Sequence, residues 1–353
     1  MGKNELLETD LAYAWDLLPR VSRSFAFVTS CLNEEKRSKI GMAVMVFYHI
    51  CRVLDTIEDS NINNEEKWNL YDQFLASLKD NYSFDALERI STDLSDNDGY
   101  VELMQNLRRI VSVYSTLDLQ AKKIIQRYAE EMAKGMYQFG EKAILTFQDL
   151  DEYCHPVAGI VGYGLTELFY HYGHFPVLDQ NILLLARHFG LALQKVNIIR
   201  DFGRDYDRQV YFWPATLVEK FELNYHQLVL KRNSEAAKEI IQEMIDQSQV
   251  DMDQAVRYLI KIPNREEKVR IFCGVSLLLA LRTLEKIRDN PQILNPQAHR
   301  NGDPSLKVSR QEVLKLVQSI RENVTDNFFF VNFYDSIKSG IFRQSISVVE
   351  EKV

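Results

Sequence analysis

The sequence predicts a single all-α domain. The scarcity of helix-breaking residues and the helical spacing of the apolar residues support this prediction. Glycine occurs 14 times and proline 8 times in 353 residues, which is sparse for a chain of many short strands. Apolar residues recur at three- and four-residue steps over long stretches, whereas alternation of apolar and polar residues is not sustained. No repeat or low-complexity linker divides the sequence. We therefore expect one domain over residues 1–353, with a core from about residue 12 to residue 340.

The expected helices are separated mainly by prolines and short polar segments. The first begins at about Glu34, repeats its apolar residues as at Ile40 and Val44, and ends before the polar run Asn61–Asn64. The polar segment Ser91–Gly99 is expected to form a mobile loop. The expected helices are Glu34–Asp59, Glu65–Leu78, Tyr100–Tyr114, Asp118–Phe139, Asp149–Tyr172, Leu178–Arg204, Tyr225–Ile260, Arg265–Arg288 and Ser309–Tyr334.

Charge and cysteine usage limit the partners and the compartment. The net charge of -8 argues against a nucleic-acid partner, because phosphate backbones require a basic face. No obligate protein partner is inferred. The cysteines form no CxxC pair and lie in apolar surroundings, so we expect reduced thiols in a cytosolic protein. They are Cys31, Cys51, Cys154 and Cys273.

The sequence offers no obvious membrane segment. The N-terminal residues lack the apolar run of a signal peptide, and the apolar stretch Ile271–Leu281 is too short to span a bilayer. We therefore expect a cytoplasmic protein without a transmembrane anchor. A peripheral membrane contact through Phe328–Phe330 is left open.

Amide and acid side chains form a stripe in QKVNIIRDFGRD, residues 194–205. Asn197, Asp201 and Asp205 follow one another at four-residue steps, so they lie on one side of a helix, with Arg200 beside them. A buried carboxylate needs a partner or a metal ion. For this stripe alone, a solvated helix face with an ion pair is the more common explanation.

A second stripe lies in LDTIED, residues 54–59, where Asp55, Glu58 and Asp59 converge at a helix end. Tyr48 and Arg52 extend it backward by one turn each. A solvated acidic turn explains this stripe equally well if it is taken alone. Two such stripes on apolar helices favour Mg²⁺ ions that hold a diphosphate leaving group, within helices that accommodate a hydrocarbon chain.

Small residues gather in YCHPVAGIVGYG, residues 153–164. Pro156 removes a backbone donor and is expected to kink the helix, while Gly159 and Gly162 remove side chains from its surface. A helix surface without large side chains suits the wall of a tunnel for a hydrocarbon chain. Close packing of two helices explains it equally well.

Five motifs together resemble the squalene and phytoene synthase family of head-to-head prenyl synthases. They are SRSFA (22–26), LDTIED (54–59), YCHPVAGIVG (153–162), QKVNIIRD (194–201) with Asp205, and FWP (212–214). The resemblance implies an all-α isoprenoid-synthase fold. This fold is a helical bundle with a central prenyl pocket and two facing aspartate-rich helices.

The resemblance also implies roles for individual residues. Catalytic roles fall to Tyr153, Arg200, Asp55 and Asp201, with Tyr153 handling a proton. The Mg²⁺ ligands would be Asp55, Glu58, Asp59, Asn197, Asp201 and Asp205. Substrate-binding residues would be Ser22, Arg23, Phe25, Tyr48, Arg52, Val157, Gly162, Gln194 and Asn197. Arg23, Arg52 and Arg200 would bind phosphate groups, and Lys307 and Arg310 resemble the basic pair placed near NADPH.

The implied reaction is an Mg²⁺-dependent condensation of two farnesyl diphosphates through presqualene diphosphate to squalene, an apolar triterpene, with NADPH as reductant. Ser276 and Leu277 stand where a Pro-Gln pair is typical of squalene synthases. The alternatives are therefore presqualene diphosphate, dehydrosqualene or phytoene synthesis without reduction. A non-catalytic prenyl-binding subunit is a third alternative.

Overall fold

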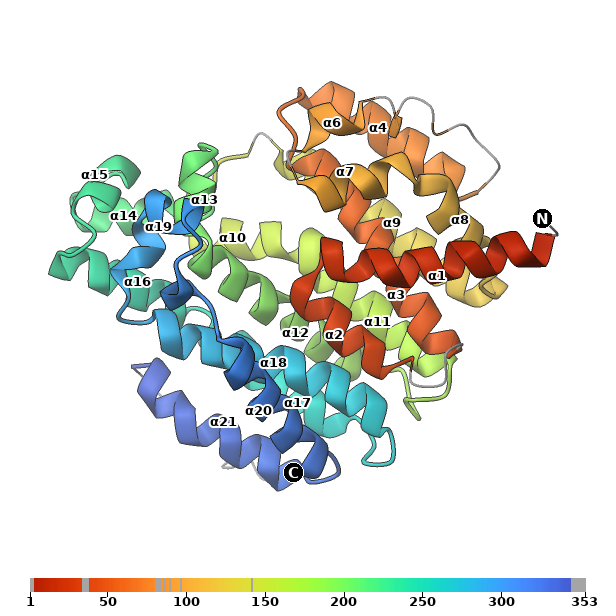
Figure 1. Ribbon diagram of the computed structural model, residues 1–353. Helices are drawn as coiled ribbons and strands as arrows, with labels where there is room; N and C mark the ends of the chain where they lie inside the picture. The colour runs from red at the N-terminus through yellow and green to blue at the C-terminus, as the bar shows by residue number, and fades with distance from the viewer. Residues whose placement is uncertain are drawn as a thin grey trace. The chain divides into compact units, whose positions relative to one another are not determined.

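A computed structural model of the chain describes residues 3–33, 38–79, 84, 87, 88, 90–95, 97–140 and 142–343. Side chains are described for all of these except Lys3, Asn4, Arg23 and Ser24. Within these ranges every regular element is a helix, so the predicted all-α fold class is confirmed (Figure 1).

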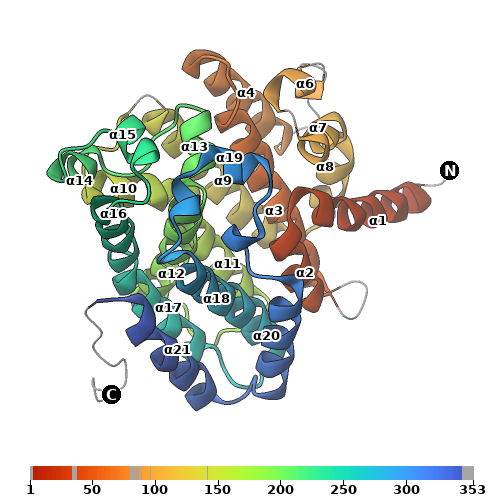
Figure 2. The same cartoon turned by 60° about the vertical axis from the view of Figure 1, so that its left-hand side comes forward.

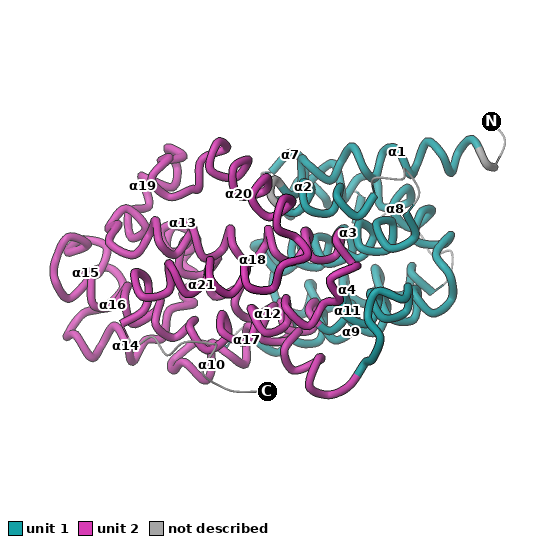
Figure 3. Tube along the Cα trace, turned by 90° about the horizontal axis from the view of Figure 1, so that it is seen from below, with its two compact units in different colours: residues 1–142, 163–178 teal, residues 143–162, 179–353 magenta. Residues whose placement is uncertain are grey.

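The chain divides into two compact units (Figure 3). Unit 1 contains residues 1–142 and 163–178, and unit 2 contains residues 143–162 and 179–353. The expectation that the chain forms one domain, with its two acidic helices facing each other across a prenyl pocket, stays a prediction.

Unit 1 is built around α3 (Lys39–Glu58), which packs against α1, α2, α4, α7, α8 and α9. Ser38 caps its first turn by accepting a hydrogen bond from the Gly41 amide, and fourteen of its residues are buried. Burial on most sides makes α3 the core helix of this unit. The other described helices that lie entirely in this unit are α1 (Lys3–Val21), α2 (Arg23–Cys31), α4 (Asn64–Ser77), α6 (Ser91–Leu94), α7 (Asp98–Gln105), α8 (Leu107–Ser115) and α9 (Leu119–Phe139).

Unit 2 is built around α12 (Gln180–Arg200), which packs against α17 (Gln249–Lys261) and α18 (Glu267–Ile287). Figure 2 shows these three helices side by side. The other helices that lie entirely in this unit are α10 (Phe147–Cys154), η1 (His155–Gly159), α13 (Phe202–Asp207), α14 (Ala215–Lys220), α15 (Tyr225–Leu230), α16 (Glu235–Asp246), η2 (Pro291–Leu294), α19 (Pro296–Arg300), η3 (Pro304–Leu306), α20 (Arg310–Glu322) and α21 (Asn327–Ile341).

Several predicted helices lie where they were expected, but each is interrupted by a break. The stretch predicted as Tyr225–Ile260 contains three helices, because the Ser234 hydroxyl caps the start of α16 and another break precedes α17. Asp326 caps α21 and divides the stretch predicted as Ser309–Tyr334. The expected mobile loop Ser91–Gly99 is wrong in part, since it contains α6 and the start of α7. Residues 34–37 of the predicted helix Glu34–Asp59 lie outside the described residues.

Two of the described helices, α3 and α12, are long and apolar enough to cross a bilayer by length and composition. The apolar window of α3 is 78% buried and that of α12 is 50% buried, as in core helices of other proteins, so this is weak evidence for a span. Phe330 is 1% exposed and packs in the core, which leaves Phe328, at 75%, as the exposed residue of the predicted aromatic contact. All four cysteines are buried free thiols, as expected.

The small residues of YCHPVAGIVGYG bring two helices into backbone contact. A Cβ atom at Gly162, in the first residues of α11 (Ile160–His171), would lie 2.0 Å from the carbonyl oxygen of Ala186 in α12. A Cβ atom at Gly190 would lie 2.2 Å from the carbonyl oxygen of Ala158. Of the two explanations that the sequence left open, close helix packing therefore accounts for Gly162.

We expect Gly190→Ala to lower the free energy of unfolding by roughly 1 to 3 kcal/mol, because the backbone of Ala158 cannot yield as a side chain could. Gly340→Ala on helix α21 is the matched control, since a Cβ atom there would meet nothing within 4 Å beyond its own helix backbone. The control should be neutral or stabilised by up to about 1 kcal/mol. Urea unfolding of both variants is the measurement. Equal stability of the two would contradict the proposed contact.

Candidate active site

The end of α3 carries an accessible polar stripe on an otherwise buried helix. Tyr48, Arg52, Asp55 and Glu58 are half-buried, and Asp59 is exposed at the C-cap, while the residues between them are mostly buried. The backbone amide of Asp59 donates to the Asp55 carbonyl at 2.9 Å and closes the last turn. These acids lie at the negative end of the helix dipole, with no basic residue in the last turn. Such a placement is unfavourable unless a cation binds there.

Arg52 is the charged partner already present in this stripe. Its guanidinium lies 3.2 Å from Asp55 and donates to the Tyr48 hydroxyl at 3.3 Å. It also stacks over the rings of Tyr48 and Tyr100, at 5.7 and 5.0 Å from their centroids. Its Nε atom is buried and has no hydrogen-bond partner among the described residues. Arg52 therefore keeps one donor for an additional acceptor.

Two further predicted residues, Phe25 and Ser22, lie beside Tyr48. The ring of Phe25 stacks on Tyr48, with centroids 4.5 Å apart, and the Tyr48 hydroxyl donates to the Val21 carbonyl at 3.1 Å. Ser22 caps α2 by accepting a hydrogen bond from the Phe25 amide at 3.2 Å. Four predicted residues, Phe25, Tyr48, Arg52 and Asp55, thus come together. The side chain of Arg23 lies outside the described part of the chain.

The negative charge of Asp55 is only partly compensated within the protein. Burial raises the pKa of its carboxyl to about 6, the neighbouring Asp59 adds to this rise, and Arg52 offsets only part of it. A bound cation would relieve both causes. The acids of this stripe therefore fit a metal ion, although no three His, Cys, Asp or Glu side chains among the described residues form a preformed cluster. Mg²⁺ does not need one, since it takes one or two carboxylates and completes its shell with water and phosphate.

The second stripe crosses a break between two helices, so its prediction as part of one helix Leu178–Arg204 is wrong. Helix α12 ends at Arg200, and Asp201 has φ -94° and ψ 10°, outside the helical range, before α13 begins. Backbone bonds still join Asp201 to Asn197 at 2.9 Å and Asp205 to Asp201 at 3.1 Å. The four-residue steps therefore survive the break. Gln194 is half-buried and Asn197 exposed, on the accessible side of α12.

Arg200 pairs with Asp201 through two of its nitrogens. Nε donates to Oδ1 at 2.9 Å and Nη2 to Oδ2 at 2.5 Å. Burial alone would raise the pKa of Asp201, but the bonds from Arg200 hold it below its ordinary value. The two stripes therefore differ, because Arg200 balances the negative charge of Asp201, whereas the negative charge of Asp55 is balanced only in part. Asp205 lies 3.9 Å from Arg208.

A small hollow of about 10 Å³, roughly the room of one water molecule and partly open to solvent, adjoins the Arg200–Asp201 pair. Arg204, His299 and Lys307 also line it, so the hollow has an excess of basic groups. Lys307 was predicted near a phosphate-bearing cofactor, whereas Arg310 is exposed at the start of α20 and does not line the hollow. The remaining lining residues are Gly302, Asp303 and Leu306.

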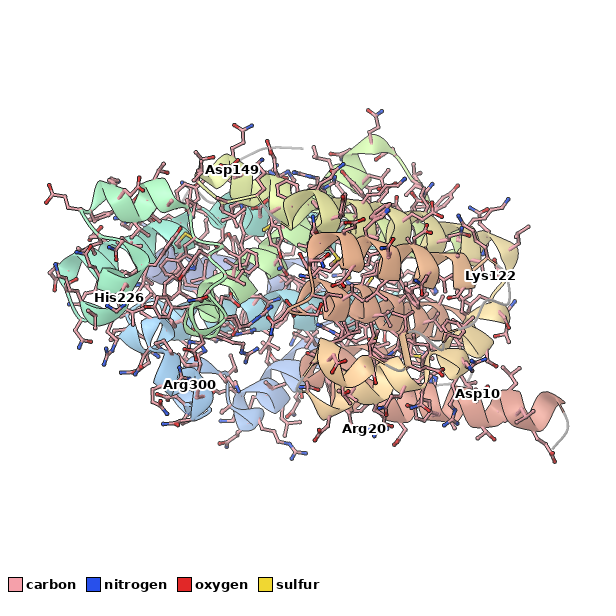
Figure 4. The ribbon with its side chains drawn as sticks, turned by 90° about the horizontal axis from the view of Figure 1, so that it is seen from above. Asp10, Arg20, Lys122, Asp149, His226 and Arg300 are labelled. Atoms are coloured by element: carbon pink, nitrogen blue, oxygen red, sulfur yellow. The ribbon has the colours of Figure 1, made fainter. Side chains whose placement is uncertain are left out.

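Tyr153 lies in the core, next to the FWP motif. It is 6% exposed and stacks on Phe212, with centroids 4.7 Å apart. Trp213 of the same FWP motif donates from its indole nitrogen to the Ile198 carbonyl of α12 at 3.2 Å. Helix α10, which carries Tyr153, starts with a capping box between Thr146 and Asp149. Figure 4 labels Asp149 at this end of the helix. Pro156, expected to cause a kink, lies in the π-helix η1.

Sequence reasoning missed several residues of these surroundings. Tyr100 and His299 stand far from any acidic motif in the sequence, and nothing in their spacing connects them to Arg52 or to the hollow. His299 packs on α13, where a Cβ atom at Gly203 would lie 2.4 Å from its ring. Val157 is half-buried in η1, with no described contact that assigns it a role.

In the metal-free protein, we expect Asp55→Asn to gain stability relative to the wild type as pH rises. Because the pKa of the Asp55 carboxyl is raised in the folded state, the wild-type protein loses stability as the pH rises from the unfolded pKa of this group to about 6. Above that pH the loss of stability stays at its full size. At pH 7 the gain should reach roughly 1 to 3 kcal/mol. Urea unfolding with EDTA at pH 4.5 and pH 7 measures it. A gain that shrinks with rising pH would refute the raised pKa.

The comparisons with known proteins agree with the resemblance. The family described as Squalene/phytoene synthase matches residues 18–310. Squalene synthase 1 of Arabidopsis thaliana is 30% identical over 293 residues, which cover 81% of this chain and 67% of that protein. Squalene synthase of Schizosaccharomyces pombe is 30% identical over 303 residues, 83% of this chain and 63% of that protein. This chain thus spans about two thirds of the length of these relatives.

A solved structure gives the same result for the fold. The structure of TcSQS in complex with a ligand superposes with a TM-score of 0.80 and 28% sequence identity. The superposition covers 96% of this chain and 94% of that chain.

Proposed function

Because this chain belongs to the squalene/phytoene synthase family, we propose that it joins two farnesyl diphosphates head to head, through presqualene diphosphate, to squalene. NADPH is the proposed reductant of the last step. The observation that carries the proposal is the arrangement at the ends of α3 and α12. Each long apolar helix ends in an accessible acidic group with an arginine beside it.

The acidic groups supply the metal sites of this proposal. Asp55, Glu58 and Asp59 would hold Mg²⁺ at one, and Asn197, Asp201 and Asp205 at the other. When bound, Mg²⁺ neutralises the diphosphate as the carbon–oxygen bond ionises. The raised pKa of Asp55 supports the first assignment, because a carboxyl crowded by another acid gains from a cation.

The basic groups bind the phosphate oxygens. Arg52 has a buried Nε donor without a partner among the described residues, and the rings of Tyr48 and Tyr100 hold its guanidinium in place. Arg200, Arg204 and Lys307 line one hollow, which suits a phosphate group of substrate or cofactor. Permanently charged guanidinium groups keep this affinity at any physiological pH.

Tyr153 handles the proton. Its phenol is shielded from bulk water and stacked on Phe212, which holds the ring in one orientation next to the site. Apolar residues around the site exclude water, which would otherwise capture a carbocation. The carbocation can then be attacked by the double bond of the second substrate.

The proposed function predicts the products of one incubation. Purified protein with farnesyl diphosphate and Mg²⁺ should release diphosphate, and NADPH should convert the product to squalene, as identified by mass spectrometry. Dehydrosqualene formed with or without NADPH would instead establish the non-reductive alternative. Absence of diphosphate release would favour a non-catalytic prenyl-binding protein.

Lys307→Ala should separate the two halves of the reaction. If Lys307 binds the phosphate-bearing reductant, the variant should need at least about tenfold more NADPH for squalene formation. This is the change in affinity expected from the loss of one charge-assisted hydrogen bond. Its release of the first diphosphate should change less than twofold. Lys315→Ala is the control, an exposed lysine on α20 that does not line the hollow. An equal loss in both halves would place Lys307 at the prenyl diphosphate instead.

A further inference from the structure

A buried lysine joins three helices of unit 2 next to the candidate site. Lys195 of α12 is 5% exposed, and its Nζ lies 2.6 Å from Asp151 of α10 and 2.6 Å from Asp251 of α17. It also donates to the Gln247 carbonyl at 3.3 Å. His188, two turns earlier on α12, lies 2.6 Å from the other oxygen of Asp251. No role in the mechanism above uses this cluster.

The cluster is a network of charges rather than a surface pair. The side chain of Asp251 is 5% exposed, so it could not remain charged without partners. Burial alone would lower the pKa of Lys195, but Asp251 and Asp151 together raise it, and His188 and Lys195 hold the pKa of Asp251 down. Lys195 and Asp251 therefore both remain ionised around neutral pH. Removing the lysine would leave two carboxylates facing each other.

The network joins residues that lie in or next to two sequence motifs, YCHPVAGIVG and QKVNIIRD. Asp151 precedes Tyr153 by two residues on α10, and Lys195 lies between Gln194 and Asn197 on α12. The glycine contacts at Gly190 and Gly162 bring the backbones together. Contacts between small residues set how close two helices lie, but they resist sliding only weakly because no side chain interlocks. An ion pair with a fixed geometry, such as that of Lys195 with Asp151, can prevent this sliding.

We propose that Lys195 is a positioning residue that fixes α10 relative to α12, and thereby fixes Tyr153 relative to Asn197 and Asp201. This inference rests on the proposed function. It predicts a loss of turnover without a loss of binding, because a small displacement of reacting groups slows chemistry while the phosphate contacts survive. A displacement of about 1 Å can cost about 100-fold in rate.

Asp151→Asn is the first test, because its carboxylate is 46% exposed and its loss should not prevent folding. We expect kcat to fall about tenfold while KM for farnesyl diphosphate stays within twofold, and Asp151→Glu to recover most of the loss. Hydrogen exchange should become faster in residues 147–159. Unchanged exchange together with unchanged kcat would overturn the proposal.

Lys195→Met should have the larger effect, about 100-fold in kcat per folded molecule. Lys338→Met is the matched control in the same unit, since Lys338 is also buried, at 2% exposed, and lies 2.6 Å from Asp253, away from both motifs. A comparable loss of turnover in the control would show a general stability effect and overturn the proposal.

The two proposals fail in different ways. A wild-type protein that releases no diphosphate from farnesyl diphosphate refutes the proposed function, and the exchange of residues 147–159 in Asp151→Asn then decides the positioning role by itself. A wild-type protein that is active, with Asp151→Asn raising KM instead of lowering kcat, refutes the positioning role alone.

Discussion

The backbone contact between α12 and the helical segment that crosses it governs the architecture of unit 2. Gly190 lies against the Ala158 carbonyl and Gly162 against the Ala186 carbonyl, closer than any side chain would permit. Helices α17 and α18 pack against α12 as well. Among the residues of α12 that remain accessible, Gln194, Asn197 and Arg200 lie in its last two turns, next to Asp201. These polar groups are the part of α12 that packing leaves available for chemistry.

The two acidic groups solve the problem of charge in opposite ways. Arg200 neutralises Asp201 through two hydrogen bonds, whereas Arg52 shares its charge between Asp55 and two aromatic rings. Burial and the neighbouring Asp59 leave the pKa of Asp55 raised, because Arg52 offsets their effect only in part. On the proposed function, the group at α3 gains most from a cation. The group at α12 can offer its arginine to an anion and its carboxylate to a metal ion at the same time.

Sequence periodicity predicted the positions of most helices well, because long apolar repeats and few breakers leave little choice. It failed where a local capping side chain outweighed the pattern, as at Ser234 and Asp326, and where α12 ends before Asp201. The polar stripes themselves were predictable, since they depend on spacing within one chain segment. The cation–π contact of Tyr100, the hollow around His299 and the charge network of Lys195 were not, because each joins residues that only tertiary packing brings together.

The π-helix η1, between Tyr153 and the glycine contacts, bears on how this segment can vary in length. A π-helical turn holds one more residue than an α-helical turn over a similar rise. Loss of a single residue here could be absorbed by reverting to regular α-helix, and the side chains on both sides of the deletion would keep nearly their present directions. Tyr153 and Gly162 could then both keep their present neighbours. Loss of a second residue would rotate one side relative to the other by about 100°. Homologous chains should therefore tolerate the loss of one residue in this segment more readily than the loss of two.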